Sequence, residues 1–172
     1  MRRTKITHLI CYDDHRTFTE DVRKRFSDPD KYLVESFHTQ HEFSGHLRKI
    51  TEAVYCKVAI VVIPDGSDTI DAIGKMTDEI IKTDPQTGII LVVPSDKMEE
   101  VRKVIKFNID AYIIKNTNAI LRIHNEVKKL ISEHNINIYR KRRNLSLTIL
   151  IAFMVLCLFA LLIAYFRLPM YF

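Results

Sequence analysis

The stretch Lys57-Val58-Ala59-Ile60-Val61-Val62-Ile63-Pro64-Asp65-Gly66 decides the fold of this chain. Its continuous run of β-branched and small apolar residues predicts a strand buried on both faces, because such runs are typical of the middle of parallel sheets. Pro-Asp-Gly then has the composition of a turn. Ligands gather at the carboxyl ends of strands in open α/β sheets, so the residues from Ile63 to Gly66 are expected to bear most on function.

Apolar runs and amphipathic segments alternate on both sides of this strand. Four further strands are predicted at 6–12, 32–37, 89–93 and 111–114. Helices are predicted at about 15–27, 43–54, 67–82 and 96–107, and a last one follows Asn116 and Thr117 with Ile120, Ile123, Val127, Leu130 and Ile131 on its apolar face. Asp96 and Glu99 have the spacing of a capping box. This alternation predicts an α/β fold, a five-stranded parallel sheet with helices on both faces.

A run of 22 residues without a single charge lies at 145–166. As a helix it is about 33 Å long, enough to cross a hydrocarbon core of roughly 30 Å. A buried core helix is usually shorter and amphipathic, whereas here apolar side chains cover every side. We therefore predict a soluble domain at 1–132, a basic juxtamembrane segment at 133–144, a transmembrane helix at 145–166 and a short tail at 167–172. Segment 133–144 is either a linker or an extension of the preceding helix.

The charges that flank this run predict its orientation. Arg140, Lys141, Arg142 and Arg143 precede it and only Arg167 follows. The positive-inside rule then places the N-terminal domain in the cytoplasm, in a single-pass protein of the cytoplasmic membrane. No secretory signal peptide is predicted. The net charge of +5 is explained more simply by anionic lipid head groups beside this cluster than by nucleic acid.

Cysteine and histidine spacing favours no metal site. The three cysteines have no metal-ligand spacing and are expected to be unpaired thiols in a reducing compartment; they are Cys11, Cys56 and Cys157. Three histidines and a glutamate resemble a metal cluster in composition but fit no structural zinc pattern, which predicts a solvated surface; they are His38, His41, His46 and Glu42. Glycine-rich phosphate loops and the Gly-x-Ser-x-Gly elbow do not occur, so no enzymatic activity is predicted.

Acidic residues end the first predicted strand and a lysine ends the fifth. These residues lie in two segments, Cys11-Tyr12-Asp13-Asp14 and Asn108-Ile109-Asp110-Ala111-Tyr112-Ile113-Ile114-Lys115. Because of these two segments and five β/α units in register, residues 4–132 resemble the receiver domain of bacterial response regulators. The resemblance implies the flavodoxin-like strand order 2-1-3-4-5 and a role in two-component signalling.

The resemblance also implies roles for single residues. Asp13 and Asp14 match the acidic pair that, with a third aspartate, holds Mg²⁺ in the family. Lys115 matches the lysine beside the phosphoryl group, and Tyr112 matches the aromatic residue that switches rotamer on activation. Two family positions are degenerate in this sequence. Ile63 stands at the phosphoacceptor position and Val93 at the Ser/Thr position, and neither side chain has an oxygen for a phosphoryl group or a metal.

Several of these residues have a second interpretation. Asp65 is either an alternative phosphoacceptor or a turn residue. Asp13 and Asp14 are either metal ligands or acidic residues that cap the first turn of the following helix. Lys115 belongs either to a phosphoryl site or to a salt bridge with those aspartates, and Tyr112 is either a switch or a half-buried strand residue.

The favoured functional prediction is a membrane-anchored pseudo-receiver that acts by phosphorylation-independent protein contacts, with no cofactor. The alternative is an Mg²⁺-dependent receiver phosphorylated on Asp65 in a phosphorelay. A third hypothesis is a structural subunit of a membrane complex. The expected partners are membrane lipid and a protein at the membrane, namely a histidine kinase, another receiver, a membrane complex or a second copy of the chain; no nucleic acid is expected.

Overall fold

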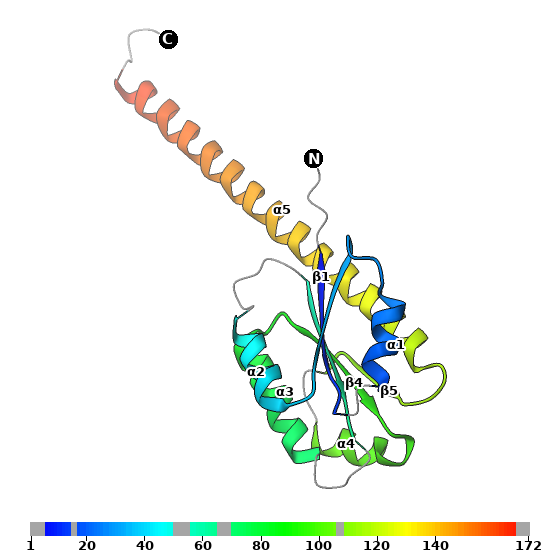
Figure 1. The fold of residues 1–172 in the computed structure, drawn as a ribbon. Coiled ribbons are helices and arrows are strands. Elements are labelled where there is room, and N and C mark those ends of the chain that lie inside the picture. Colours follow the sequence, from blue (N-terminus) through cyan, green and yellow to red (C-terminus); the bar gives the residue numbers. More distant parts are fainter. Residues whose placement is uncertain (1–5, 15–16, 50–55, 65–69, 106–108, 168–172) are drawn as a thin grey trace. The chain divides into compact units, whose positions relative to one another are not determined.

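The computed structural model describes residues 6–14, 17–49, 56–64, 70–105 and 109–167. The strands are β1 (Thr7–Tyr12), β2 (Tyr32–Phe37), β3 (Lys57–Val62), β4 (Gly88–Val93) and β5 (Ala111–Ile114). The helices are α1 (Thr17–Arg25), α2 (Gln40–Lys49), α3 (Ile70–Thr83), α4 (Met98–Val104) and α5 (Ala119–Arg167), with a 3₁₀ turn, η2, at Ser95–Lys97. All strand pairs are parallel and the order is β2-β1-β3-β4-β5 (Figure 1). The α/β fold and the strand order 2-1-3-4-5 are thus confirmed.

Strand β3 lies at the centre of the sheet, and each of its residues is buried. It pairs with β1 on one side and β4 on the other, so that Val61 stands beside both Tyr12 and Leu91. A strand with two neighbours and two covered faces has no exposed position, which is why its sequence after Lys57 is continuously apolar instead of alternating.

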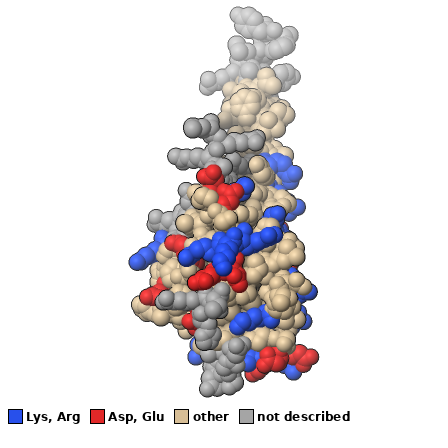
Figure 2. All heavy atoms as spheres, turned by 45° about the vertical axis from the view of Figure 1, so that its right-hand side comes forward, with Lys and Arg blue, Asp and Glu red and all other residues tan. Residues whose placement is uncertain are grey.

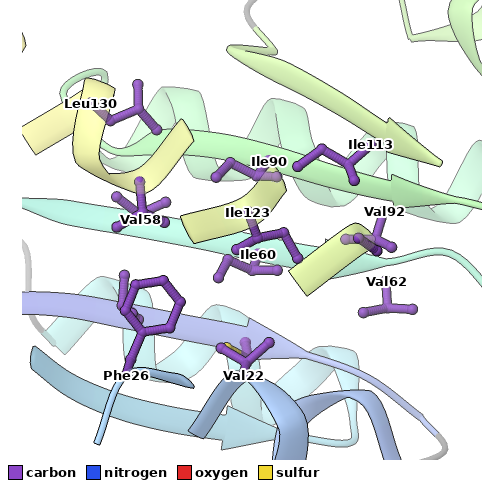
Figure 3. Close-up of a cluster of buried hydrophobic side chains, with 14 of the residues drawn as sticks. Val22, Phe26, Val58, Ile60, Val62, Ile90, Val92, Ile113, Ile123 and Leu130 are labelled. Carbon is purple, nitrogen blue, oxygen red and sulfur yellow. The ribbon is translucent and has the colours of Figure 1, made fainter. Parts of the chain in front are cut away.

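The two faces of the sheet carry separate hydrophobic clusters. Figure 3 shows the first, in which α1 and α5 cover alternate residues of the strands. Its members include Val22, Phe26, Val58, Ile60, Val62, Ile90, Val92, Ile113, Ile123 and Leu130. The second cluster joins the opposite side chains to α2, α3 and α4. Cys11 and Cys56 are free and buried in the first cluster, and burial raises the pKa of these thiols to about 12 and about 11.

Gly88, the first residue of β4, lets α5 approach the sheet closely. A Cβ atom built there would lie 2.8 Å from Leu130 Cδ1. The absence of a side chain at Gly88 therefore makes room for Leu130, which is 8% exposed in the first cluster.

Helix boundaries differ from the sequence predictions mainly at α4. The predicted helix at 96–107 is a 3₁₀ turn followed by a shorter α-helix that ends at Val104. The capping box of Asp96 and Glu99 is wrong: η2 begins after Pro94 and α4 after Lys97, and neither cap has a side-chain hydrogen bond. The predicted beginnings of α1 and α3 and the predicted end of α2 lie partly outside the described residues.

Helix α5 continues from Ala119 to Arg167 without a break in secondary structure, so segment 133–144 is helical. The chain divides into two compact units, Met1–Ile131 and Ser132–Phe172. Within α5, an 18-residue window has a mean hydropathy of 2.9 and none of it is buried. By length and composition this helix is a candidate membrane span. In Figure 2 the coloured atoms toward the upper end of α5 are all tan.

Candidate functional site

The carboxyl ends of the strands bring the predicted site positions to one edge of the sheet. Each strand of the site ends next to or at one of these positions. Asp13, Ile63 and Lys115 are the residues directly after β1, β3 and β5, and Val93 is the last residue of β4. Backbone pairing continues to this edge, because the Ile63 N–H donates to Val92 O at 2.9 Å and the Lys115 N–H to Val93 O at 2.8 Å. The register that the resemblance implied therefore aligns these positions along neighbouring strand ends.

Asp13 serves as a cap for α1. Its side chain is buried, at 2% exposed, and its Oδ2 accepts hydrogen bonds from the N–H groups of Phe18 and Thr19 at 3.1 and 3.3 Å. These donors lie in the first turn of α1, where N–H groups have no partner within the helix. Of the two interpretations, the described contacts support capping.

A histidine that sequence reasoning did not assign to this edge lies beside Asp13. The His38 Nδ1 donates to the backbone oxygen of Asp13 at 2.7 Å. His38 follows β2 directly, and β2 pairs with β1. No motif marks His38. The only sequence signal for its place at this edge is that it directly follows the strand predicted to pair with β1.

The two degenerate positions are filled by core side chains. Ile63 and Val93 are both 0% exposed and belong to the second hydrophobic cluster. Neither can coordinate a cation or accept a phosphoryl group. Asp65, the alternative acceptor, lies outside the described residues.

The described residues at this edge offer Mg²⁺ an incomplete set of oxygen ligands, because position 63 has no oxygen in its side chain. A hard divalent cation of this size requires near-octahedral oxygen coordination, usually with one or two carboxylates in its first shell. Here one Asp13 oxygen already accepts two N–H groups, and the acceptor position offers no oxygen at all. Asp14 and Lys115 are exposed.

Tyr112 connects β5 to the end of α4. Its hydroxyl donates to the backbone oxygen of Ile105 at 2.6 Å, and the Arg102 guanidinium lies 5.7 Å from the ring centroid. Partial burial raises the pKa of the Tyr112 phenol above its ordinary value, while Arg102 opposes this. A change of the Tyr112 rotamer would break both of these contacts between β5 and α4.

A hollow of about 250 Å³ lies beside Tyr112. It is lined by Ala111, Tyr112, Ile113, Arg122, Asn125 and Glu126. Among the strands that the structure describes, β5 pairs with β4 alone, so its outer edge presents backbone groups next to the charged residues of α5. Backbone and charge together suit contact with a protein surface.

The remaining histidines have separate partners. His46 bonds with the Glu35 carboxylate at 2.7 Å, at the junction of α2 and β2, and His41 is exposed. Within the described ranges, no three His, Cys, Asp or Glu side chains are grouped so that they could hold a metal ion.

Comparison with known proteins identifies the fold. No family model and no curated protein matches the chain. Among solved structures, it is similar to a receiver domain from Clostridium thermocellum (TM-score 0.59, 17% identity, 76% of this chain and 98% of that one) and to a CheY-like receiver domain from Methanospirillum hungatei (TM-score 0.55, 20% identity, 77% and 98%). The fold is that of receiver domains.

A protein described as an adenylate cyclase from Rhodopirellula baltica shares this receiver-like fold (TM-score 0.60, 9% identity, 78% of this chain and 94% of that one). At such identities the likeness concerns the fold alone. The described site residues therefore have to be judged by their own contacts.

Replacing Asp13 by alanine tests the capping role. We expect the free energy of unfolding to fall by about 1 to 2 kcal/mol, as for loss of other N-cap side chains. Asp14→Ala is the matched control and should change it little, since Asp14 is exposed. Thermal unfolding of the full-length protein with and without Mg²⁺ measures both effects. A rise in wild-type Tm with Mg²⁺ that Asp13→Ala abolishes would contradict the capping interpretation.

Proposed function

We propose that this chain is a membrane-anchored pseudo-receiver, which acts in signalling through protein contacts and takes up no phosphoryl group. The observation that carries the proposal is the complete burial of Ile63 and Val93 at the carboxyl edge of the sheet. A receiver needs an exposed carboxylate at the first position and a hydroxyl at the second. Both positions instead contribute to hydrophobic packing under α3 and α4.

The anchor is supported by the candidate span in α5 and by the charges before it. In this proposal the receiver-like unit lies on the cytoplasmic side of the membrane, because the basic cluster precedes the span. The protein then acts by binding and not by catalysis.

The face beside Tyr112 is the proposed contact surface for a protein partner. It combines the open edge of β5, the hollow against α5 and the ring of Tyr112 fixed to α4. A histidine kinase, another receiver, a subunit of a membrane complex or a second copy of the chain would each bring a folded surface to such a face.

A phosphorylation assay tests the central part of the proposal. Full-length protein in detergent is incubated with a small phosphodonor and Mg²⁺, and a phosphorylatable receiver is treated in parallel as the positive control. We expect no increase in mass for this chain. A hydroxylamine-labile gain of one phosphoryl group that maps to Asp65, and that disappears in Asp65→Asn, would overturn the proposal in favour of a phosphorelay receiver.

A further inference from the structure

Four consecutive cations surround α5 just before its uncharged run. Arg140, Lys141, Arg142 and Arg143 are all helical, and the side chains of Arg140, Lys141 and Arg143 are exposed. Successive residues of an α-helix are rotated by about 100° and rise by about 1.5 Å, so four consecutive positions are distributed around the axis within about 5 Å of its length. These residues form a basic ring and not a stripe.

The basic ring has no anionic partner within its own helix. Ion pairs along a helix join residues three or four positions apart. Those neighbours of the ring contain no Asp or Glu, and no acidic residue occurs anywhere after Glu133. The anions that neutralise the ring must therefore come from outside this part of the chain.

The shape of the ring indicates which anions these are. A protein partner would contact one side of the helix and leave the opposite cations in water, whereas a layer of lipid head groups surrounds a helix on every side at one depth. The uncharged run begins two residues after Arg143, so the ring lies at head-group depth when that run fills the hydrocarbon core.

Ser146 and Thr148 are polar residues near the beginning of the run, and the helix backbone accepts a hydrogen bond from the second. The Thr148 hydroxyl donates to the backbone oxygen of Asn144 at 2.9 Å. It can therefore enter the apolar layer without an unmet hydrogen bond. We propose that the basic ring binds the phosphates of anionic phospholipids and selects these lipids over zwitterionic ones. This inference rests on the membrane anchor of the proposed function.

Lipid selectivity can be measured with a single tryptophan, because the natural sequence has none. Leu147→Trp places this reporter on an exposed position of α5, one turn after the ring. The full-length variant is reconstituted in vesicles of phosphatidylglycerol and phosphatidylcholine, in which either one lipid or the other carries brominated, quenching chains. At low ionic strength we expect at least about a fivefold preference for the anionic lipid, and a smaller one as salt screens the ring.

The matched variants distinguish an effect of the basic ring on lipid preference from an effect of the overall positive charge. Changing Arg140, Lys141, Arg142 and Arg143 to glutamine should make the two lipids quench equally. Changing four exposed lysines of the receiver-like unit to glutamine should leave the preference intact; these are Lys24, Lys49, Lys82 and Lys103.

Three outcomes would overturn the inference. Equal quenching with the intact ring, or a preference that survives the glutamine changes in the ring, would contradict lipid selection alone and leave the pseudo-receiver proposal unaffected. Quenching by neither lipid would show that the span is not in the bilayer and would overturn the anchor as well. The phosphorylation assay is independent of all three.

Discussion

Replacing Ile63 by aspartate is expected to lower the free energy of unfolding by about 3 to 5 kcal/mol, the cost of leaving a charge buried without a partner. The substitution places a carboxylate where a phosphorylatable receiver has its acceptor. In this chain, however, the side chain at 63 is 0% exposed and packs in the second hydrophobic cluster. We therefore expect loss of stability and no gain of phosphorylation.

The loss should depend on pH in a defined direction. Burial raises the pKa of a carboxyl group, so the new aspartate would take up a proton more readily in the folded than in the unfolded protein. The difference from wild type should therefore shrink as the pH falls toward 4. Ile63→Asn, which is polar but does not titrate, should lack this dependence on pH.

Denaturant unfolding of the full-length variants in detergent, followed by circular dichroism, measures these differences. Ile63→Val is the conservative control and should cost about 0.5 to 1.5 kcal/mol. An Ile63→Asp protein as stable as the wild type, which also takes up a phosphoryl group from a small donor with Mg²⁺, would show that the edge of the sheet is an open site. The pseudo-receiver proposal would then lose its main support.

The sheet could be predicted from sequence because its strands are short apolar runs between turn residues. Strand β3 is buried throughout and β4 is buried from Ile89 onward, and each strand was predicted to within one residue at both ends. The end of α4 was not predictable in the same way. Its last turn contacts Tyr112 through the Ile105 oxygen, and this tertiary contact has no local sequence pattern.

In the candidate site, too, the features set by the strands could be predicted from sequence and those set by tertiary packing could not. Parallel strands of known order place Asp13, Ile63, Val93 and Lys115 at one edge, so their positions followed from sequence. Other features of the site depend on how the helices and loops pack on the sheet. These are the hydrogen bonds that Asp13 Oδ2 accepts, the contact of His38 with the Asp13 backbone and the hollow beside β5. A lysine at the beginning of the fully buried β3 was a further signal, because a charge inside the sheet requires a partner.

That partner is Asp84, and the Lys57–Asp84 ion pair supports the second prediction with a large effect. Lys57 Nζ lies 2.7 Å from Asp84 Oδ2, and the two side chains are 3% and 16% exposed. Asp84 Oδ1 also accepts the Gln86 N–H at 3.1 Å. The pair therefore connects the beginning of β3 to the turn between α3 and β4.

Asp84→Asn is expected to lower the free energy of unfolding by about 3 to 5 kcal/mol, because it leaves the Lys57 ammonium buried without a counter-charge. Asparagine keeps an oxygen for the Gln86 N–H, so the change isolates the charge. Lys57→Met should cost less, about 1 to 3 kcal/mol, since it keeps the buried stem and leaves a carboxylate that is closer to water and still hydrogen-bonded to the turn.

The double variant Lys57→Met with Asp84→Asn distinguishes a pair from two separate sites. If the ammonium is the costly group, removing it as well should make the double variant more stable than Asp84→Asn alone, which additive effects cannot do.

Burial by itself would raise the pKa of Asp84, but hydrogen bonds from Lys57 and the turn lower it below the ordinary 3.8. The contribution of the pair is thus present above that pH and is lost as the pH falls through the lowered value, so wild-type stability should decrease there more steeply than that of Asp84→Asn. Equal slopes, or a double variant less stable than either single one, would contradict this account of β3.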